Sequence, residues 1–509
     1  MPEKEIDFDK ELWQAADLLR GNVAANEYRD IILGLVFLKY LSDAFLNRQE
    51  EIKALCADKN SEWYTEDAED ITYELDEKDN YSSANVFWIP SEARWSYLLE
   101  NATQPDIGKK VNDALKLIEV ENKDLKGLLP KKYLSTGLDQ HNLGQIITLL
   151  TNITAGHEKD FLGRIYEFYM SKFAERGGNK GGEFFTPSSV VKLLVEMLEP
   201  YKGRIFDPAC GSGGMFVQSI KFIEAHQGKK EELAIYGQEN IEDYVKLCKM
   251  NLAIRGLSGE IKMGSSYHND QFKSLKADFV IANPPFNDDK WGAARVADDD
   301  QRFKYGIVPD GNANFLWVQH FITHLSNNGL AGFVMANGSM SVGGKEGEIR
   351  EKIIEDDLID CMVALPERLF FTTGIPACLW FVSKNKANRK GKTLFIDARK
   401  IYHKVSRAHN AFSNEQLEKI ADVYRDFKAG KDIEDVKGFC KVVDTKTIEE
   451  NGYVLTPGRF VGVEETVEDD EPFVEKMERL SLELHDQFKR SNELEEIIRV
   501  NLEELGYGV

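Results

Sequence analysis

The chain has 509 residues, a length that predicts two to four folded units at roughly 100 to 200 residues per domain. Its 42% hydrophobic and 29% charged residues are typical of folded globular proteins and do not favour a disordered or fibrous chain. The formal charge of −22 argues against binding of nucleic acid by this chain unaided, because phosphate contacts rest on Lys and Arg; such binding needs a local basic groove or a basic partner.

The sequence shows no sign of export or membrane insertion. Residues 1–7 lack a basic and apolar leader, and no window approaches the roughly 18 apolar residues of a membrane helix, so we expect a cytoplasmic protein. The six cysteines lie far apart without a Cys-x-x-Cys pair, and we expect reduced thiols rather than disulfides. From the cysteines and the scattered histidines we predict no metal site.

The sequence pattern predicts helices in the first 150 residues. Residues 30–41 place apolar side chains on most faces of a helix, which indicates a buried helix in an N-terminal helical domain. The glycine-rich stretch 176–182 then breaks the periodicity. After it, Thr186 is predicted as the N-cap of a new helix and Pro187 as its first residue.

The middle of the chain alternates short β-rich runs with helical segments, a pattern that predicts parallel βαβ units and a doubly wound α/β sheet. Ligands of such sheets bind beyond the carboxyl ends of the strands. The predicted strands are 204–207, 233–239, 260–264, 278–282, 330–336, 359–365 and 378–383.

Beyond about residue 400 the strand signal fades, and residues 472–505 read as one long charged helix. Apolar Phe473, Met477, Leu480 and Leu484 follow one another at steps of four and three, which suits a helix-packing seam. Two interpretations of this helix remain open: it packs on its own domain as an amphipathic helix, or it binds a partner. We therefore expect a helical domain at 1–155, a catalytic domain at 156–400 and a mostly helical region at 401–509.

A glycine-rich turn follows the first predicted strand. Asp207 ends this strand, and the glycines after it let backbone approach a ligand at the start of the next helix. Some glycine-rich turns are purely structural, so the motifs around this turn decide whether it binds a ligand. Its candidate binding residues are Asp207, Gly211, Ser212, Gly213 and Gly214.

Glu239 ends the second predicted strand, where a carboxylate can accept hydrogen bonds from both hydroxyls of a ribose. A dinucleotide site would have Gly-x-Gly-x-x-Gly with the acid about 20 residues further on, and the order here differs. The pattern therefore favours an adenosine without a pyrophosphate.

Asn283-Pro284-Pro285-Phe286 directly follows the fourth predicted strand. The two prolines stiffen the turn and direct the Asn283 amide and the Pro284 carbonyl into the site, where both can accept hydrogen bonds from an amino group. Phe286 offers a flat face on which an extruded base can stack. These four residues are our candidate catalytic residues.

These motifs, in this order, resemble those of the amino-group DNA methyltransferases that make N6-methyladenine. The resemblance implies a Rossmann-like fold and S-adenosylmethionine as cofactor, with the glycine-rich turn on the methionine side and Glu239 on the ribose. The segment before the first strand is similar to a further cofactor motif of the family. Its residues here are Glu183, Phe184, Phe185, Thr186, Pro187 and Ser188.

Nearly the whole chain resembles the methylation subunit (HsdM) of type I restriction-modification systems. Besides the core motifs, the resemblance rests on the helical N-terminus and on residues 312–315, 365–367 and 455–460. It implies DNA as substrate and a separate specificity subunit bound by two methylation subunits. A restriction subunit would join the full complex.

Two site assignments and two other functions stay open. Ser265 or Ser266 is a candidate contact to the cofactor adenine, and Phe370 or Phe371 a candidate second wall for the flipped base. A methyltransferase acting on protein glutamine or RNA would also use an Asn-Pro-Pro-aromatic turn. A subunit that keeps the fold only to scaffold a complex is the other alternative.

Overall fold

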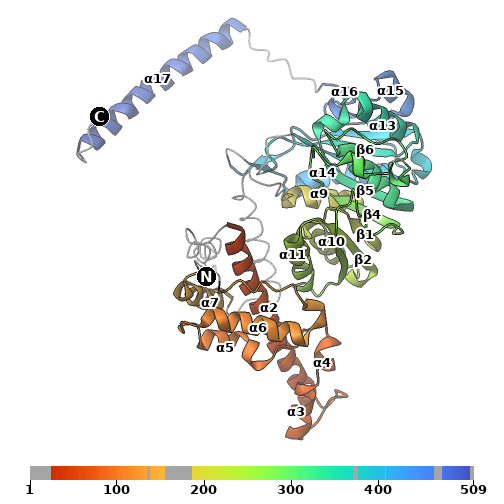
Figure 1. Cartoon of the computed structure of the whole chain (residues 1–509). Helices are drawn as coiled ribbons and strands as arrows, with labels where there is room; N and C mark the ends of the chain where they lie inside the picture. The colour runs from red at the N-terminus through yellow and green to blue at the C-terminus, as the bar shows by residue number, and fades with distance from the viewer. Residues whose placement is uncertain are drawn as a thin grey trace. The chain divides into compact units, whose positions relative to one another are not determined.

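The computed structural model describes residues 25–134, 138–154, 186–297, 299–370, 376–406, 409–463 and 473–504. Its contacts divide the chain into a large unit that ends at Val461 and a small unit that starts at Gly462 (Figure 1). In the described part of the chain, no helix combines the length and the apolar character needed to cross a membrane.

The N-terminal part of the large unit is helical, as predicted. Residues 31–41 of α2 are almost all buried in its apolar core. They can be buried on every side because apolar residues lie on all faces of this part of the helix. Leu247 and Met250 of α11 also belong to this core. The helices are α2 (Ala25–Ala57), α3 (Ala68–Asp76), α4 (Asp79–Ser82), α5 (Trp95–Glu100), α6 (Ile107–Glu121) and α7 (Gln140–Thr154).

The rest of the large unit is built on a nine-stranded sheet with the order β11-β8-β6-β7-β5-β4-β1-β2-β3. All seven predicted strands are present, within a few residues of the predicted bounds. The strands are β1 (Gly203–Asp207), β2 (Leu233–Glu239), β3 (Gly259–Met263), β4 (Ala277–Ala282), β5 (Leu325–Ala336), β6 (Ile359–Ala364), β7 (Ala377–Ser383), β8 (Lys392–Asp397) and β11 (Cys440–Asp444).

The sheet is mixed, whereas the sequence pattern predicted parallel units. β7 runs antiparallel to β5 and β6, and β11 runs antiparallel to β8; the other pairs are parallel. No helix separates β6 from β7 in the described residues, so the chain returns directly beside the strand it has left. β8 and β11 were not predicted. β11 is a half-buried edge strand with charged residues among its apolar ones, so its strand pattern is weak.

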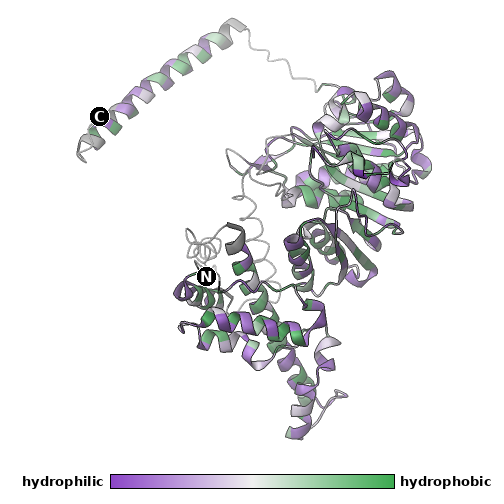
Figure 2. Cartoon of the chain, viewed as in Figure 1, coloured by the Kyte–Doolittle hydropathy of each residue, from purple (hydrophilic) through white to green (hydrophobic). Residues whose placement is uncertain are grey.

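Helices cover both faces of the sheet and complete a three-layer α/β/α fold, in which apolar strands lie between the two helical layers (Figure 2). One face packs against α9 (Ser188–Leu198), α10 (Gly214–Ala225), α11 (Glu242–Ala253) and α14 (Asn414–Lys428). The other face packs against α12 (Asn314–His324), α13 (Gly344–Glu355), α15 (Thr445–Glu450) and α16 (Pro457–Phe460).

The segment after residue 400 does not form a separate helical region as far as Val461. β11 pairs with β8, and α14 packs beside α9, so the expected boundary at 400 falls between two neighbouring strands of one sheet. The small unit contains α17 (Phe473–Glu504), the long helix predicted at 472–505.

Candidate active site

The strand order reverses between β1 and β4, because β2 and β3 lie on one side of β1 and β4 lies on the other. Such a reversal opens a crevice beyond the carboxyl ends of the two strands. Phe206 pairs with Val280, so Asp207 at the end of β1 lies level with Ile281, two residues before Asn283. The topology therefore brings the glycine-rich turn and the Asn-Pro-Pro-Phe turn to the same edge.

The glycine-rich turn has the backbone that glycine permits. Gly211 and Gly213 have φ angles of +50° and +82°, which lie in the left-handed region. A Cβ on Gly213 would lie 2.8 Å from the Cys248 sulfur, whereas a Cβ on Gly211 or Gly214 would meet open space. The turn is thus packed on one side and exposes bare backbone on the other, as close approach of a ligand requires.

Glu239 ends β2 and turns its carboxylate toward this glycine-rich turn. One carboxylate oxygen accepts a hydrogen bond from the Gly211 backbone N–H at 2.9 Å. The other oxygen accepts from the backbone N–H groups of Asn240 and Ile241, at 2.7 and 3.0 Å. These bonds fix the carboxylate between β1 and β2, where the ribose of an adenosine would lie in the predicted arrangement.

Asp207 is 1% exposed and lies at the start of the same turn. Burial raises the pKa of its carboxyl to about 8, and the nearby Glu239 charge adds to this rise, although the Ala209 N–H donates to the carboxylate at 2.9 Å. A buried acid of this kind favours a cationic neighbour. The ammonium of a bound amino acid moiety would supply that positive charge.

Asn283 is held by Thr186, which lies two residues before the start of α9. The Asn283 amide nitrogen donates to the Thr186 hydroxyl oxygen at 2.7 Å. The amide oxygen is buried and has no hydrogen-bond partner in the described part of the protein. Such an orphaned acceptor costs free energy unless a ligand with a donor group satisfies it.

Thr186 was predicted as the N-cap of the helix that follows. The helix α9 instead starts at Ser188 with Pro187 in the N-cap position, and no side chain caps it. The Thr186 hydroxyl is directed to Asn283 instead of to the helix N-terminus. Glu183, Phe184 and Phe185 lie outside the described residues, so their predicted cofactor role stays a prediction.

The Phe286 side chain is 9% exposed and meets Phe370 edge to face, with 6.4 Å between ring centroids. Phe370 precedes residues outside the described ranges, among them Phe371. The two rings come from separate loops at the edge of the sheet where Asn283 lies, and they contact each other. Their role as walls for the flipped base remains a prediction.

The turn after Phe286 is fixed by the start of α12. Asn287 has a φ of +53°, a left-handed conformation that asparagine tolerates better than most residues. Its backbone N–H donates to the Asn314 side-chain oxygen at 3.0 Å, and the Asn314 amide nitrogen donates back to the Asn287 side-chain oxygen at 2.9 Å. This reciprocal pair joins the 312–315 segment to the turn that contains Asn283-Pro284-Pro285-Phe286.

The two serines proposed for the cofactor adenine differ in their contacts. The Ser266 hydroxyl is buried and donates to the Pro208 carbonyl oxygen at 2.6 Å, so it joins the loop after β3 to the glycine-rich turn. The Ser265 backbone carbonyl accepts from the Asn269 N–H at 2.8 Å. Ser265 is therefore the better candidate for adenine, because its hydroxyl does not make that internal bond.

Cys210, within the glycine-rich turn, is not arranged as a nucleophile. A hydrogen bond involving Cys248, together with burial, raises the pKa of the Cys210 thiol well above its usual value. The thiol is therefore neutral at physiological pH, and its reactivity as a nucleophile is low.

Asp270, His320 and His324 form a buried cluster on the α12 face of the sheet. His320 and His324 are four residues apart on one helix, a metal-ligand spacing that our prediction of no metal site overlooked. The His324 ring nitrogen lies 3.2 Å from an Asp270 oxygen, and burial together with the neighbouring His324 lowers the pKa of His320 well below its usual value. Arg302 also lies 4.0 Å from this oxygen, and its charge opposes a bound cation.

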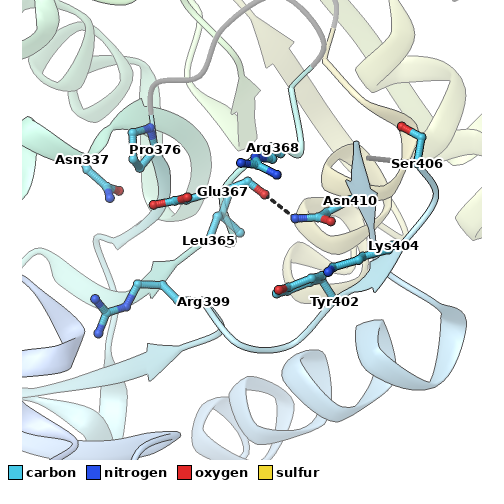
Figure 3. Close-up of a pocket in the computed structure, with 10 residues that line it drawn as sticks. All are labelled: Asn337, Leu365, Glu367, Arg368, Pro376, Arg399, Tyr402, Lys404, Ser406 and Asn410. Atoms are coloured by element: carbon cyan, nitrogen blue, oxygen red, sulfur yellow. Dashed lines mark hydrogen bonds between the residues drawn. The ribbon is translucent and has the colours of Figure 1, made fainter. Parts of the chain in front are cut away.

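A cavity of about 660 Å³ opens beside the loops that follow β5, β6 and β8 (Figure 3). Since these three strands run parallel to β4, the cavity lies on the same edge of the sheet as Asn283. The sequence analysis did not predict this cavity, because its residues are scattered over 74 positions and only Leu365 and Glu367 belong to a segment noted there. The lining consists of Asn337, Leu365, Glu367, Arg368, Pro376, Arg399, Tyr402, Lys404, Ser406 and Asn410.

Comparison with known protein families gives two adjacent matches. Residues 157–469 match the N-6 DNA Methylase family, and residues 8–150 match the HsdM N-terminal domain. Together they cover most of the chain.

Individual relatives agree with these family matches. The chain is 43% identical to the type I restriction enzyme MjaIX methylase subunit of Methanocaldococcus jannaschii, over 98% of this chain and 92% of the relative. It is 44% identical to the HindI methylase subunit of Haemophilus influenzae, over 82% of this chain and all of the relative.

Among solved structures, the type I restriction-modification methyltransferase subunit of Streptococcus thermophilus superposes with a TM-score of 0.77. That structure is 27% identical and matches 90% of this chain and 99% of its own.

Proposed function

Because the chain belongs to the N-6 DNA methylases, as a methylation subunit of the type I restriction-modification kind, we propose that it methylates the exocyclic N6 of an adenine that is flipped out of DNA. One observation carries this proposal. The Asn283 amide presents a buried oxygen without a hydrogen-bond partner in the described residues, while its nitrogen is fixed by Thr186.

In this proposal the chain itself acts mainly by positioning. The Asn283 side-chain oxygen and the Pro284 carbonyl oxygen accept hydrogen bonds from the adenine amino group, which direct the nitrogen lone pair at the methyl carbon. Phe286 stacks on the extruded base. S-adenosylmethionine supplies the methyl group on a sulfonium, so no covalent enzyme intermediate is required.

The residues of the glycine-rich turn fit this cofactor. Gly211 and Gly214 border open space, Glu239 is fixed where a ribose would lie, and Asp207 is a buried acid suited to an ammonium group. We assign cofactor binding to these residues, with Ser212, Gly213 and the 183–188 segment beside them.

We further propose that sequence recognition comes from a separate specificity subunit that binds two copies of this chain, with a restriction subunit in the full complex. The net charge of −22 supports a basic partner, since it leaves the chain poorly suited to hold DNA alone. Helix α17 forms its own unit and exposes an apolar row, including Met477, Leu484 and Phe488 at 47%, 50% and 60%. We assign the partner contact to this row.

Transfer of labelled methyl from S-adenosylmethionine to unmodified genomic DNA tests the function directly. We expect N6-methyladenine in the digested DNA only when the specificity protein is co-expressed. Label in protein or RNA would instead support the methyltransferases of those substrates. Cofactor binding by a folded complex without any transfer would favour a scaffold.

Removing the residues after Gly462 should abolish assembly with the specificity subunit, because the truncation deletes α17. Cofactor binding should be retained, since the deleted part forms a separate unit. Copurification and calorimetry measure the two effects. Unchanged assembly would rule this contact out.

A matched pair of substitutions sharpens the truncation experiment. Leu484→Asp changes the apolar row, whereas Leu482→Asp changes another exposed leucine about 200° away around the helix. Only Leu484→Asp should weaken assembly. Equal loss in both variants would point to helix stability rather than to a contact surface.

A further inference from the structure

The cavity beside β5, β6 and β8 is a candidate binding site that the proposed reaction does not yet use. Its lining carries three cationic side chains, Arg368, Arg399 and Lys404, against one carboxylate, Glu367 (Figure 3). This cationic lining stands out in a chain with a net charge of −22. It is the kind of local basic site that an acidic DNA-acting protein requires.

Arg368 is held in an unusual backbone conformation, with a φ of +59°. Asn410 supports it: its side-chain nitrogen donates to the Glu367 carbonyl oxygen, and its backbone N–H donates to the Arg368 carbonyl oxygen, both at 2.8 Å. Strained conformations that the surroundings fix in this way concentrate at ligand sites. The turn thus presents Arg368 at a defined place on the cavity wall.

Asn410 also fixes the position of Lys404. It lies in β9 (His403–Lys404), which pairs antiparallel with β10 (Asn410–Ala411), and Lys404 is directly opposite Asn410. The hairpin therefore couples an exposed lysine to the Arg368 turn through one buried asparagine. Lys404 forms no ion pair among the described residues.

Arg399 forms the third side of the cavity. Its guanidinium makes a two-point ion pair with Asp397, with N···O distances of 2.8 and 2.5 Å, while the side chain stays 55% exposed. The pair fixes the direction of the guanidinium but neutralises much of its charge. Lys404, which lacks such a partner among the described residues, therefore attracts an anion more strongly than Arg399 does.

The cavity adjoins the proposed site of the flipped base. The segment that carries Glu367 and Arg368 continues into Phe370, whose ring contacts Phe286 of the catalytic turn. A ligand in the cavity and a base on Phe286 would thus contact one continuous stretch of chain. The volume of about 660 Å³ exceeds that of a bare phosphate and accommodates a nucleotide.

We propose that this cavity binds the sugar-phosphate backbone of the DNA strand next to the flipped adenine, with a phosphodiester between Arg368 and Lys404. The inference rests on the proposed function and adds the residues that hold the substrate strand. Such contacts fix the position of the strand and do not read its sequence. They would keep the extruded nucleotide in register with Asn283.

The test measures the affinity of the complex with its specificity subunit for duplex DNA that contains its methylation site, between 50 and 200 mM salt. Each phosphate contact contributes about 0.9 to the slope of log affinity against log salt. One phosphate contact corresponds to about a 3.5-fold change over this range, so the double variant Arg368→Gln with Lys404→Gln should reduce the loss of affinity by about 3.5-fold. Lys404→Gln alone should reduce it by a smaller factor, because Arg368 still contacts the same phosphate.

Lys392→Gln is the matched control, because it removes the same charge from an exposed lysine at the opposite end of β8. It should leave the slope unchanged. Equal slopes for Lys404→Gln and Lys392→Gln would overturn the inference while wild-type methylation stands. Absence of methylation in the wild type would instead overturn the proposed function.

Two further measurements distinguish a DNA-backbone site from a loss of folding and from a site for a free nucleotide. Cofactor affinity and the unfolding midpoint should remain those of the wild type, because neither Arg368 nor Lys404 lies in the cofactor turn. The wild type could also bind free dAMP, and Lys404→Gln could lose that binding without any change in the salt slope of DNA affinity. This result would assign the cavity to a free nucleotide and would also overturn the inference.

Discussion

Replacement of Asn283 by alanine will lower the rate of methyl transfer by at least about a hundredfold, the effect typical of losing one group that stabilises developing charge. The variant loses the buried amide oxygen that has no hydrogen-bond partner among the described residues and the nitrogen that donates to Thr186. Cofactor binding should remain largely intact, because Asn283 belongs to the other turn. Single-turnover transfer and calorimetric binding of S-adenosylmethionine measure the two effects separately.

Two further variants define what Asn283 contributes. Asn283→Asp keeps an acceptor oxygen in nearly the same shape and should retain more activity than the alanine variant. Phe286→Ala should also abolish methylation without loss of cofactor, since it removes the stacking face. Loss of cofactor binding by both alanine variants would show that the loop has a different role.

Asp207→Asn will weaken cofactor binding by about tenfold to a hundredfold, the range expected when a hydrogen bond to a charged group is lost. The wild-type carboxyl has a pKa of about 8 without cofactor, because burial and Glu239 disfavour its charge. A bound ammonium lowers this pKa, so binding releases a proton. Affinity should therefore rise with pH up to about 8, by at most about tenfold per pH unit.

Calorimetry in two buffers of different ionisation enthalpy measures this proton release. Asp278→Asn, at the opposite end of β4, is the control and should keep the wild-type pH dependence. An Asp207→Asn variant that still releases a proton would contradict the assignment.

The same shift has a consequence for stability. Because the folded-state pKa of Asp207 is raised, its contribution to stability is present below the unfolded pKa near 3.8 and is lost as pH rises through about 8. The Asp207→Asn variant without cofactor should not show this fall in folding stability, because asparagine does not ionise. Chemical unfolding of both proteins between pH 5 and 9 measures the difference.

The parts of the fold that the sequence predicted correctly are those that contiguous residues encode. The apolar runs that end at Asp207, Glu239 and Ala282 are strands, and each is followed by a turn with its own chemistry. Parallel strands bring all their carboxyl ends to one edge, so the order of the motifs was enough to predict that they meet. Their roles toward cofactor and base remain predictions.

Other parts depend on how distant segments pack. The antiparallel course of β7 and the addition of β8 and β11 follow from pairing between strands, which short charged or apolar runs do not specify. The metal-type spacing of His320 and His324 was visible in the sequence. Only the buried Asp270 beside them identifies that pair as part of a cluster.

The sequence by itself determined the α/β class, the glycine-rich turn, the Asn-Pro-Pro-Phe turn and the family motifs. These features are encoded locally, in strand ends and in the glycine and proline residues that follow them. The orientation of the Asn283 amide was decided by Thr186, 97 residues earlier in the chain, and the cationic cavity by three loops that the sheet brings together. The physical reason is the range of the forces involved. Turn chemistry acts between neighbouring residues, whereas hydrogen-bond partners and charge clusters form only after the crossover helices have packed on the sheet.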